Sequence, residues 1–249
     1  MSDSVSLGNM IDAATHAERN DVMHGMMRTK KRGNTPLDIT WYGHSCFRVS
    51  ERNRTAIVTD PFSENIGLPV PKLKADVVTI SHDEPGHNNT EAVKGVSHIL
   101  TGPGEYEIGS VFITGLELHQ IDGQIARWNI AFRFEYDNLT VLHLGDLAHV
   151  PDQSTIENFG EVHVLLLPVG GGMGLRASQA AEVVGLVEPA YVIPMHYGMP
   201  GVNLDLEPVD KFLKAMGVTT VHETDVLKVS GSDFPEQSQV VLLKQQVQA

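Results

Sequence analysis

Residues 77–87 read Val-Val-Thr-Ile-Ser-His-Asp-Glu-Pro-Gly-His, and the interpretation of the whole chain starts from them. Four β-prone residues stop abruptly at a segment with two imidazoles and two carboxylates, the pattern of a buried strand that presents polar side chains at its C-terminal edge. Imidazole nitrogen and carboxylate oxygen bind zinc or iron at about 2.0–2.2 Å. Pro85 and Gly86 favour a turn that lets His82 and His87 converge. The alternative is a polar surface loop that happens to contain histidines.

Three further donors of the metal-binding type follow apolar runs in the same way. His119 ends the run 111–118, and Asp146 follows the run 140–145. His196 follows the short apolar segment that starts at Tyr191. Donors that gather at the ends of several strands are typical of a metal site, so the set favours metal binding over the surface loop.

In this order, the donors resemble the metallo-β-lactamase superfamily, and within it the metal-dependent hydrolases similar to ascorbate-6-phosphate lactonase. The resemblance covers nearly all of residues 37–244. It rests on five segments, namely Trp41-Tyr42-Gly43-His44-Ser45-Cys46-Phe47, Thr59-Asp60-Pro61-Phe62, residues 81–87, Leu144-Gly145-Asp146-Leu147 and Pro194-Met195-His196-Tyr197. It implies an α/β fold, a four-layer αββα sandwich of two mixed β-sheets with helices outside. Many short β runs and few, late helices agree with that fold.

The central loop departs from the family pattern, His-x-His-x-Asp-His, at two positions. Glu84 stands where the resemblance implies the second histidine, and Gly86 stands where it implies the aspartate. One carboxylate is lost and one is gained, so the negative charge is unchanged but moves from the second metal towards the first.

The resemblance implies two metal positions that share Asp146. The first position would hold His82, Glu84, His119 and Asp146; the second would hold His87, His196 and Asp146. Three protein ligands and water are enough for a catalytic metal, so we expect one firmly held divalent ion and a second, weaker one. A carboxylate in place of an imidazole gives the first site a harder ligand, in the hard–soft sense, and shifts its preference towards manganese or iron. Zinc remains a candidate beside these two metals.

Three other residues are candidates near the metals. The resemblance places His44 at the entrance to the metal site, where it would either hydrogen-bond to a metal ligand or face the substrate. The alternative is a purely structural histidine. Asp60 is expected to orient a ligand imidazole. His149 is a candidate proton donor to the leaving group, because no aspartate at position 86 can share that work, although a structural role is an alternative. Asp146 completes the predicted catalytic set with His44 and His149.

Length and composition favour one large domain. The chain has 249 residues, and residues 37–249 show no internal boundary. Residues 1–36 stand apart as an N-terminal extension, either flexible or an arm that contacts another subunit of a homo-oligomer. The single cysteine, Cys46, allows no intrachain disulfide.

Charge and hydropathy restrict the partners. A net charge of −13 argues against nucleic acid or an anionic membrane as the main partner, which leaves a small-molecule substrate. No apolar run reaches membrane-spanning length and no signal-peptide pattern is present, so we expect a cytoplasmic protein.

Local patterns predict several elements around the donors. Strands are expected over 39–49, 55–59, 162–169 and 219–229, a short helix over 91–94, and longer helices over 178–187 and 208–216. Residues 170–177 contain Gly-x-Gly-x-x-Ala and imitate a dinucleotide-binding turn, but the acidic residue expected near the end of the next strand is absent. A loop lining the substrate mouth fits these glycines better.

The expected function is that of a metal-dependent hydrolase, in which a water activated by the metal attacks an ester, lactone or phosphoester. One alternative is a non-catalytic family member whose degenerate metal site serves binding or assembly. Another is a mono-iron, oxygen-using enzyme, because His82, Glu84 and His119 form a set of two histidines and one carboxylate.

Overall fold

The computed structural model describes residues 35–122, 125–231 and 234–247. For residues 119–122 and 125–127 it describes the backbone but not the side chains. The extension expected over residues 1–36 therefore lies almost wholly outside the described residues, and its role stays a prediction.

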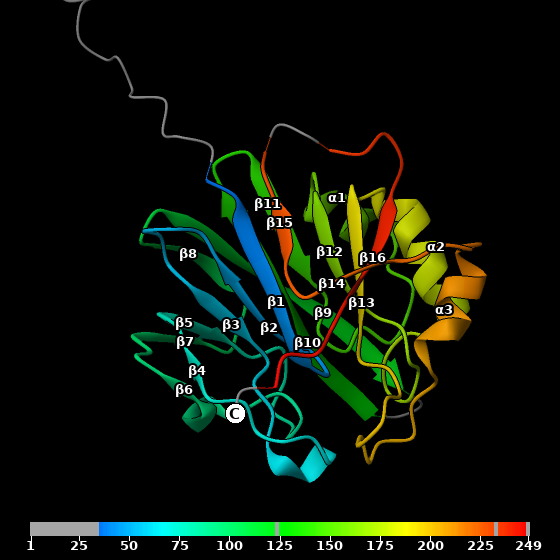
Figure 1. The fold of residues 1–249 in the computed structure, drawn as a ribbon, viewed down its shortest axis with the longest axis horizontal. Coiled ribbons are helices and arrows are strands. Elements are labelled where there is room, and N and C mark those ends of the chain that lie inside the picture. The colour runs from blue at the N-terminus through cyan, green and yellow to red at the C-terminus, as the bar shows by residue number, and fades with distance from the viewer. Residues whose placement is uncertain (1–34, 123–124, 232–233, 248–249) are drawn as a thin grey trace, which may run out of the picture. The chain divides into compact units, whose positions relative to one another are not determined.

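Six strands form the first sheet, in the order β15-β1-β2-β3-β5-β7 (Figure 1). Their bounds are β1 (Leu37–Gly43), β2 (Cys46–Ser50), β3 (Ile57–Thr59), β5 (Val77–Thr79), β7 (His98–Leu100) and β15 (Leu227–Val229). The sheet is mixed, because β15, β1, β2 and β3 are antiparallel neighbours whereas β3, β5 and β7 run parallel.

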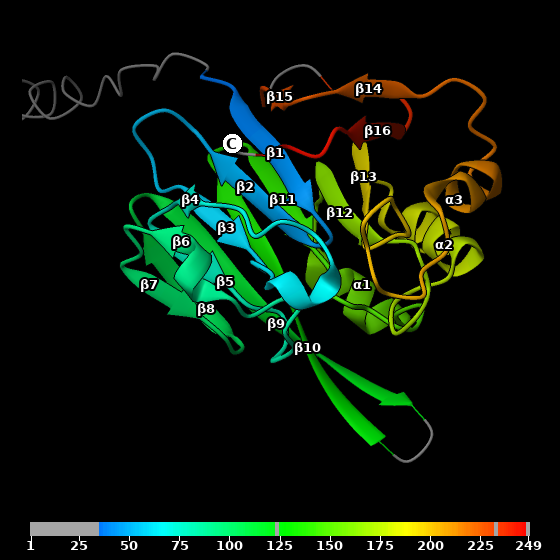
Figure 2. The same ribbon diagram turned by 60° about the horizontal axis from the view of Figure 1, so that its bottom comes forward.

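Eight strands form the second sheet, in the order β14-β16-β13-β12-β11-β10-β9-β8. Their bounds are β8 (Gly104–Ile108), β9 (Val111–Asp122), β10 (Ile125–Tyr136), β11 (Leu139–His143), β12 (Val164–Pro168), β13 (Tyr191–Met195), β14 (His222–Thr224) and β16 (Gln239–Leu243). The strands from β11 to β14 in this order are parallel and the others antiparallel. The long hairpin of β9 and β10 projects from the sheet (Figure 2).

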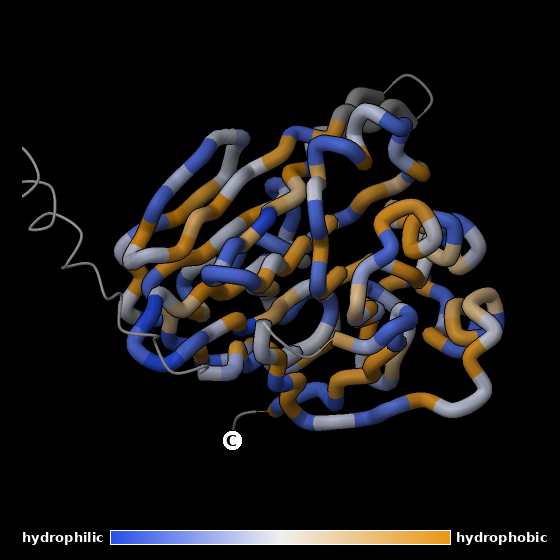
Figure 3. The backbone as a smooth tube through the Cα atoms, turned by 90° about the horizontal axis from the view of Figure 1, so that it is seen from above, coloured by the Kyte–Doolittle hydropathy of each residue, from blue (hydrophilic) through white to orange (hydrophobic). Residues whose placement is uncertain are grey.

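The two sheets pack face to face over an apolar core. Ile39 and Phe47 of the first sheet join Val141 and Leu166 of the second in one buried cluster. All five residues of β11, and all five of β12, are buried, as expected for strands covered on both faces. Apolar segments accordingly alternate with polar ones along the chain (Figure 3).

The outer face of the eight-stranded sheet is covered by the helices α1 (Gln153–Phe159), α2 (Ala177–Val187) and α3 (Val209–Ala215). Phe159, Val183 and Phe212 pack from these helices onto Leu142 and Leu165. Among the described residues, no helix is long and apolar enough to span a membrane.

The outer face of the six-stranded sheet is covered differently. Val58 and Val78 pack against Phe62, Ile66 and Leu73. These covering residues come from an irregular loop, with the 3-10 turns η1 (Glu64–Ile66) and η2 (Thr90–Ala92) and the short strands β4 (Leu73–Lys74) and β6 (Val93–Lys94) nearby. The predicted sandwich of two mixed sheets is confirmed, and the three α-helices of the described residues all lie over the eight-stranded sheet.

Several predicted elements differ in detail. The strand expected over 39–49 is broken into β1 and β2 by a turn in which Gly43 and His44 have φ angles of 113° and 51°. The helix expected over 91–94 is a 3-10 turn followed by β6, and the strand expected over 219–229 is split between β14 and β15, which belong to different sheets. Helix α1 was not predicted, because its seven residues are too few for a clear helical period.

Candidate metal centre

Strands of both sheets end at the same place and deliver polar side chains to it. From the six-stranded sheet come His44 in the β1–β2 turn and the loop after β5 that carries His82 and His87. From the eight-stranded sheet come Asp146 after β11 and His196 directly after β13. The centre therefore lies where the two sheets meet, on residues far apart in the sequence.

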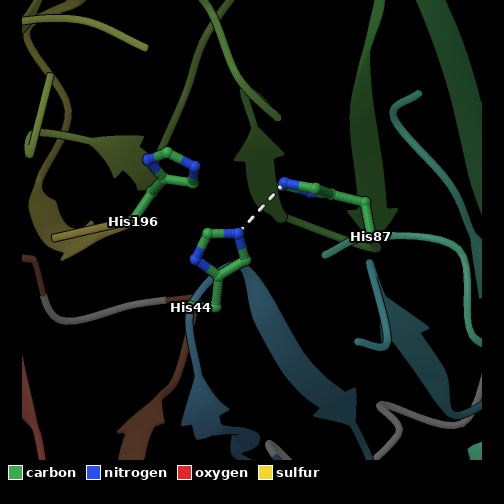
Figure 4. Close-up of side chains that lie close together, drawn as sticks. All are labelled: His44, His87 and His196. Carbon is green, nitrogen blue, oxygen red and sulfur yellow. Dashed lines mark hydrogen bonds between the residues drawn. The ribbon is translucent and has the colours of Figure 1, made fainter. Parts of the chain in front are cut away.

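Two overlapping groups of metal-type donors converge there. One consists of His44, His87 and His196 and the other of His82, His87 and Asp146, and within each group one candidate ligand atom per residue lies within 4.8 Å of the others. Figure 4 shows the rings of the first group turned towards one another.

Asp146 occupies the middle of the donors. Its Oδ2 lies 3.6 Å from Nε2 of His82 and 3.5 Å from Nε2 of His87, and its Oδ1 lies 3.2 Å from Nε2 of His196. This position between three imidazoles fits the predicted role of a carboxylate shared by two metal positions.

Asp60, directly after β3, holds two of the imidazoles in place. This fully buried carboxylate accepts hydrogen bonds from the Ser81 amide (2.7 Å), the Ser81 hydroxyl (2.6 Å) and Nδ1 of His87 (2.9 Å). Because Asp60 can only accept, His87 carries its proton on Nδ1 and keeps the Nε2 lone pair. The Ser81 hydroxyl, which already donates to Asp60, accepts a hydrogen bond from Nδ1 of His82 at 2.9 Å. His82 therefore also carries its proton on Nδ1 and keeps the Nε2 lone pair. The predicted contact between Asp60 and a candidate ligand imidazole is confirmed.

The donors fit a cation. The Nε2 lone pairs of His82 and His87 point at a carboxylate, and such an array of acceptors repels itself unless a positive charge lies among them. Nε2 of His44 also lies 3.1 Å from Nε2 of His87, and Nε2 of His196 lies 3.2 Å from Oδ1 of Asp146. A divalent metal held by these donors accounts for the arrangement.

The electrostatics of the apoprotein agree with this interpretation. Burial, and next the nearby His196 and His87, hold the pKa of His44 well below its usual range. Burial alone would raise the pKa of Asp146, but His196 and His87 outweigh it and hold that pKa well below the usual value. Burial likewise opposes the charged form of His87, but Asp146 and the hydrogen bond to Asp60 raise its pKa. The carboxylates of Asp146 and Asp60 therefore favour positive charge at the centre.

Comparison with known proteins identifies the family. A family model described as a beta-lactamase superfamily domain matches residues 38–196, which is more than half of the chain and includes every donor described above. The chain belongs to the metallo-β-lactamase superfamily. Within it, the chain is similar to proteins named UPF0173 metal-dependent hydrolases, such as that of Methanopyrus kandleri, with 26% identity over 73% of this chain and 94% of the relative.

Solved structures of the superfamily support the assignment. A proposed zinc-dependent hydrolase of the metallo-β-lactamase superfamily from Thermotoga maritima is 37% identical, covers 83% of this chain and 98% of its own, and superposes with a TM-score of 0.69. CmlA, a diiron β-hydroxylase from Streptomyces venezuelae, is 15% identical over 74% of this chain and 49% of its own, with a TM-score of 0.55. At that identity the second likeness shows the fold alone.

The metallo-β-lactamase centre of this chain differs in part from the predicted ligand sets. Glu84 is exposed and belongs to neither donor group, because a tight turn closed by the bond from the His87 amide to the Glu84 carbonyl (2.8 Å) leaves residues 83–85 on the outside. His44, predicted only as a neighbour of the metals, is instead part of a donor group. His119 lies in β9 opposite Trp128, but its side chain is outside the described residues.

The other predicted catalytic histidine lies apart. His149 is exposed and does not line the pocket over the donors. Its assignment as proton donor to the leaving group therefore gains no support from the arrangement of the described residues.

A pocket of about 450 Å³ opens over the donors. Its wall includes Gly172 and Met173, so the glycine-rich segment does line the mouth as predicted. Ile66, Leu204 and Leu206 supply further apolar surface, and sequence patterns did not point to them. Two loops bring them together, joined by the bond from the Asn203 amide to the Ile66 carbonyl (2.8 Å). Among the described residues that line this pocket, none is a lysine or an arginine.

Asn129 in β10 is a positioning residue that the sequence analysis missed. Its amide group donates to the Leu144 carbonyl (2.9 Å), and its Oδ1 accepts from the Asp146 amide (2.9 Å). The side chain thus fixes the loop that presents Asp146. The available signal was an asparagine inside an apolar strand pattern, where a buried amide has to satisfy several hydrogen bonds.

Replacing Asn129 by leucine should weaken the centre without touching a donor. The buried Asp146 amide would lose the Asn129 acceptor, and the Leu144 carbonyl would keep only the Leu147 amide, at a cost of about 2 kcal/mol in unfolding free energy. Metal affinity should fall about 10- to 100-fold, as for other groups that orient ligands. Denaturant titration and equilibrium dialysis with zinc measure the two effects. The exposed Asn138→Ala is the control; equal affinities for Asn129→Leu and the native protein would refute this role.

Proposed function

We propose that this protein is a metal-dependent hydrolase of uncharged esters or lactones that carry an apolar group. The observation that carries the proposal is the combination of converging donors with a pocket whose described lining is largely apolar and contains no lysine or arginine. The relatives named metal-dependent hydrolases agree with the reaction class.

Different residues of the chain bind the metal, orient its ligands and line the substrate pocket. A divalent metal, when bound by the donors, supplies a Lewis acid for the substrate carbonyl and lowers the pKa of a water. Asp60 and Ser81 keep the Nδ1 protons of His87 and His82 in place, so that Nε2 of each stays directed at the centre. Ile66 and Leu206 shield the reacting carbonyl from bulk water and hold the apolar part of the substrate.

Proton delivery to the leaving group is assigned to Glu84 rather than to His149. Glu84 lines the pocket two residues from His82, whereas His149 does not line it. As a carboxylate, Glu84 can take up the proton released by the attacking water and pass it to the alkoxide that leaves.

The lining favours an ester or lactone over a phosphoester. Phosphate groups are commonly held by arginine, lysine or exposed backbone amides, and charge-assisted hydrogen bonds of that kind are strong. Besides Asp146, the ionisable lining residues other than histidine are Glu84 and Asp205, both carboxylates that repel an anionic substrate. A cationic metal would offset part of this repulsion but would supply no shell of hydrogen-bond donors.

The test is a substrate panel in which the esters and phosphoesters share one leaving group and lactones are assayed beside them. Protein reconstituted with zinc, manganese or ferrous iron would be assayed on alkyl esters, lactones, and phosphomono- and phosphodiesters. The proposal expects chelator-sensitive turnover of esters or lactones. Turnover confined to phosphoesters would overturn the substrate class. Firm metal binding with no turnover of any member would favour the non-catalytic alternative, and oxygen consumption by the iron form would favour the oxygen-using one.

Leu206→Ala tests the apolar wall directly. Removing most of a side chain that contacts the acyl group should lower kcat/KM about tenfold for substrates with long apolar groups and change it little for acetyl esters. Steady-state kinetics on a series of acyl lengths measures the effect. Leu186→Ala, an exposed leucine in α2 outside the pocket, is the matched control. An equal loss at every chain length would argue against contact with the substrate.

A further inference from the structure

We propose that His44 is itself a metal ligand, and that His44, His87 and His196 form one site in which an imidazole replaces the carboxylate missing at position 86. This inference rests on the proposed function only in that both require a metal at the centre. The sequence predicts a weakly held second ion with His87, His196 and the shared Asp146 as its ligands. His44 adds a third imidazole at this second metal position, so we expect firmer binding of that ion.

The separation of the nitrogens fits two ligands of one ion. Nε2 of His44 and Nε2 of His87 lie 3.1 Å apart (Figure 4). Two nitrogens that are each about 2.0–2.1 Å from a metal lie about 2.9 Å apart at a right angle and about 3.4 Å apart at the tetrahedral angle. The His44 ring is also close to that of His196, with centroids 4.3 Å apart. The three rings thus surround a common point.

The backbone holds His44 in this position. His44 and His196 have φ angles of 51° and 52°, in the left-handed region that β-carbon-bearing residues rarely adopt. The His44 carbonyl accepts from Nε1 of Trp41 (3.0 Å) and from the amide of His196 (3.2 Å), so the two unusual turns support each other. Such strained positions cluster at functional sites.

A structural role explains the His44 side chain poorly. The residue is only 2% exposed, and a buried structural histidine normally satisfies both ring nitrogens. Within the described part of the chain, the hydrogen-bond partner of the ring is Nε2 of His87, which is itself a candidate ligand and faces Nε2 of His44. The ring's polar contacts are therefore directed at the centre and nowhere else.

Gly86 makes room for this ring. A Cβ at position 86 would lie 3.1 Å from Nε2 of His44 and 3.5 Å from Cγ2 of Ile66, so a longer side chain and the His44 ring compete for one space. The loop pattern that the chain resembles has an aspartate at this position. The structure therefore connects the glycine at position 86 with the place of the His44 ring: the loop gives up a ligand and the β1–β2 turn supplies one.

The experiment compares metal binding by four proteins: the native chain, His44→Ala, the double variant His44→Ala/Gly86→Asp, and the control His98→Ala, which removes an exposed histidine of β7. Each is loaded with cobalt(II) or zinc, dialysed against graded chelator and analysed for metal per chain. The visible absorption of the cobalt forms reports the ligand set, and circular dichroism checks folding.

The expected result is two ions in the native chain and in the control, and loss of one ion, or about 100-fold weaker binding of it, in His44→Ala. The cobalt spectrum should change with it. The double variant should regain the second ion. Native stoichiometry, affinity and spectrum in His44→Ala would overturn the inference while leaving the proposed function intact. An unrescued double variant would overturn the exchange with position 86. A native chain that binds no metal would remove both proposals.

Discussion

Asp60→Ala is expected to lower the unfolding free energy of the metal-free protein by about 3–5 kcal/mol. The carboxylate is fully buried and accepts three hydrogen bonds, two from Ser81 and one from His87. Removing it leaves these donors without an acceptor where water does not reach. Denaturant titration measures the loss, and the exposed Asp83→Ala should stay within about 0.5 kcal/mol of the native value. Similar values for both variants would contradict the assigned role.

Asp60→Asn separates stability from metal binding. Asparagine keeps the shape and tolerates the left-handed backbone at this position, where φ is 39°, so the loss of stability should be smaller. Its amide group, however, would donate towards Nδ1 of His87 and move the proton of that ring to Nε2, the atom needed by the metal. Zinc affinity should fall about 10- to 100-fold. Native affinity in this variant would show that the His87 tautomer is not controlled by Asp60.

Asp146→Ala should abolish stable metal retention. Asp146 contacts three of the four imidazoles and is the donor through which the two proposed metal positions are joined. We expect affinity to fall by about 100-fold or more, with loss of turnover on any ester or lactone that the native protein cleaves. Metal analysis after dialysis and steady-state assays measure both. The exposed Glu161→Ala serves as the control, and a variant at position 146 that keeps its full metal content would refute the shared role.

Much of the centre was predictable because strand ends follow from local patterns. The apolar runs before residue 82, Asp146 and His196 marked buried strands, and buried strands in a two-sheet sandwich end at common edges. The same rule predicts that His82, His87, Asp146 and His196 lie together. Asp60 was predictable for the related reason that metal-bound imidazoles need a carboxylate or carbonyl on the other nitrogen.

The remaining features depended on backbone geometry that sequence patterns do not encode. Residues 39–49 look like one strand, and only the turn at Gly43 and His44 aims that histidine at the centre. The hydrogen-bond partners of Asn129 lie 15 and 17 residues along the chain, beyond any local motif. Glu84 was expected among the ligands because its position in the motif was known, but the direction of its side chain depends on the tight turn.

The central claim is that residues scattered from position 44 to position 196 surround a cation. Anomalous X-ray diffraction at the zinc edge, from crystals grown with zinc, tests it most directly. The account predicts anomalous peaks among Asp146 and the Nε2 atoms of His82, His87 and His196, with one peak also within bonding distance of Nε2 of His44. Crystals with zinc in the solvent but no peak among these atoms, or with zinc bound only elsewhere, would contradict it.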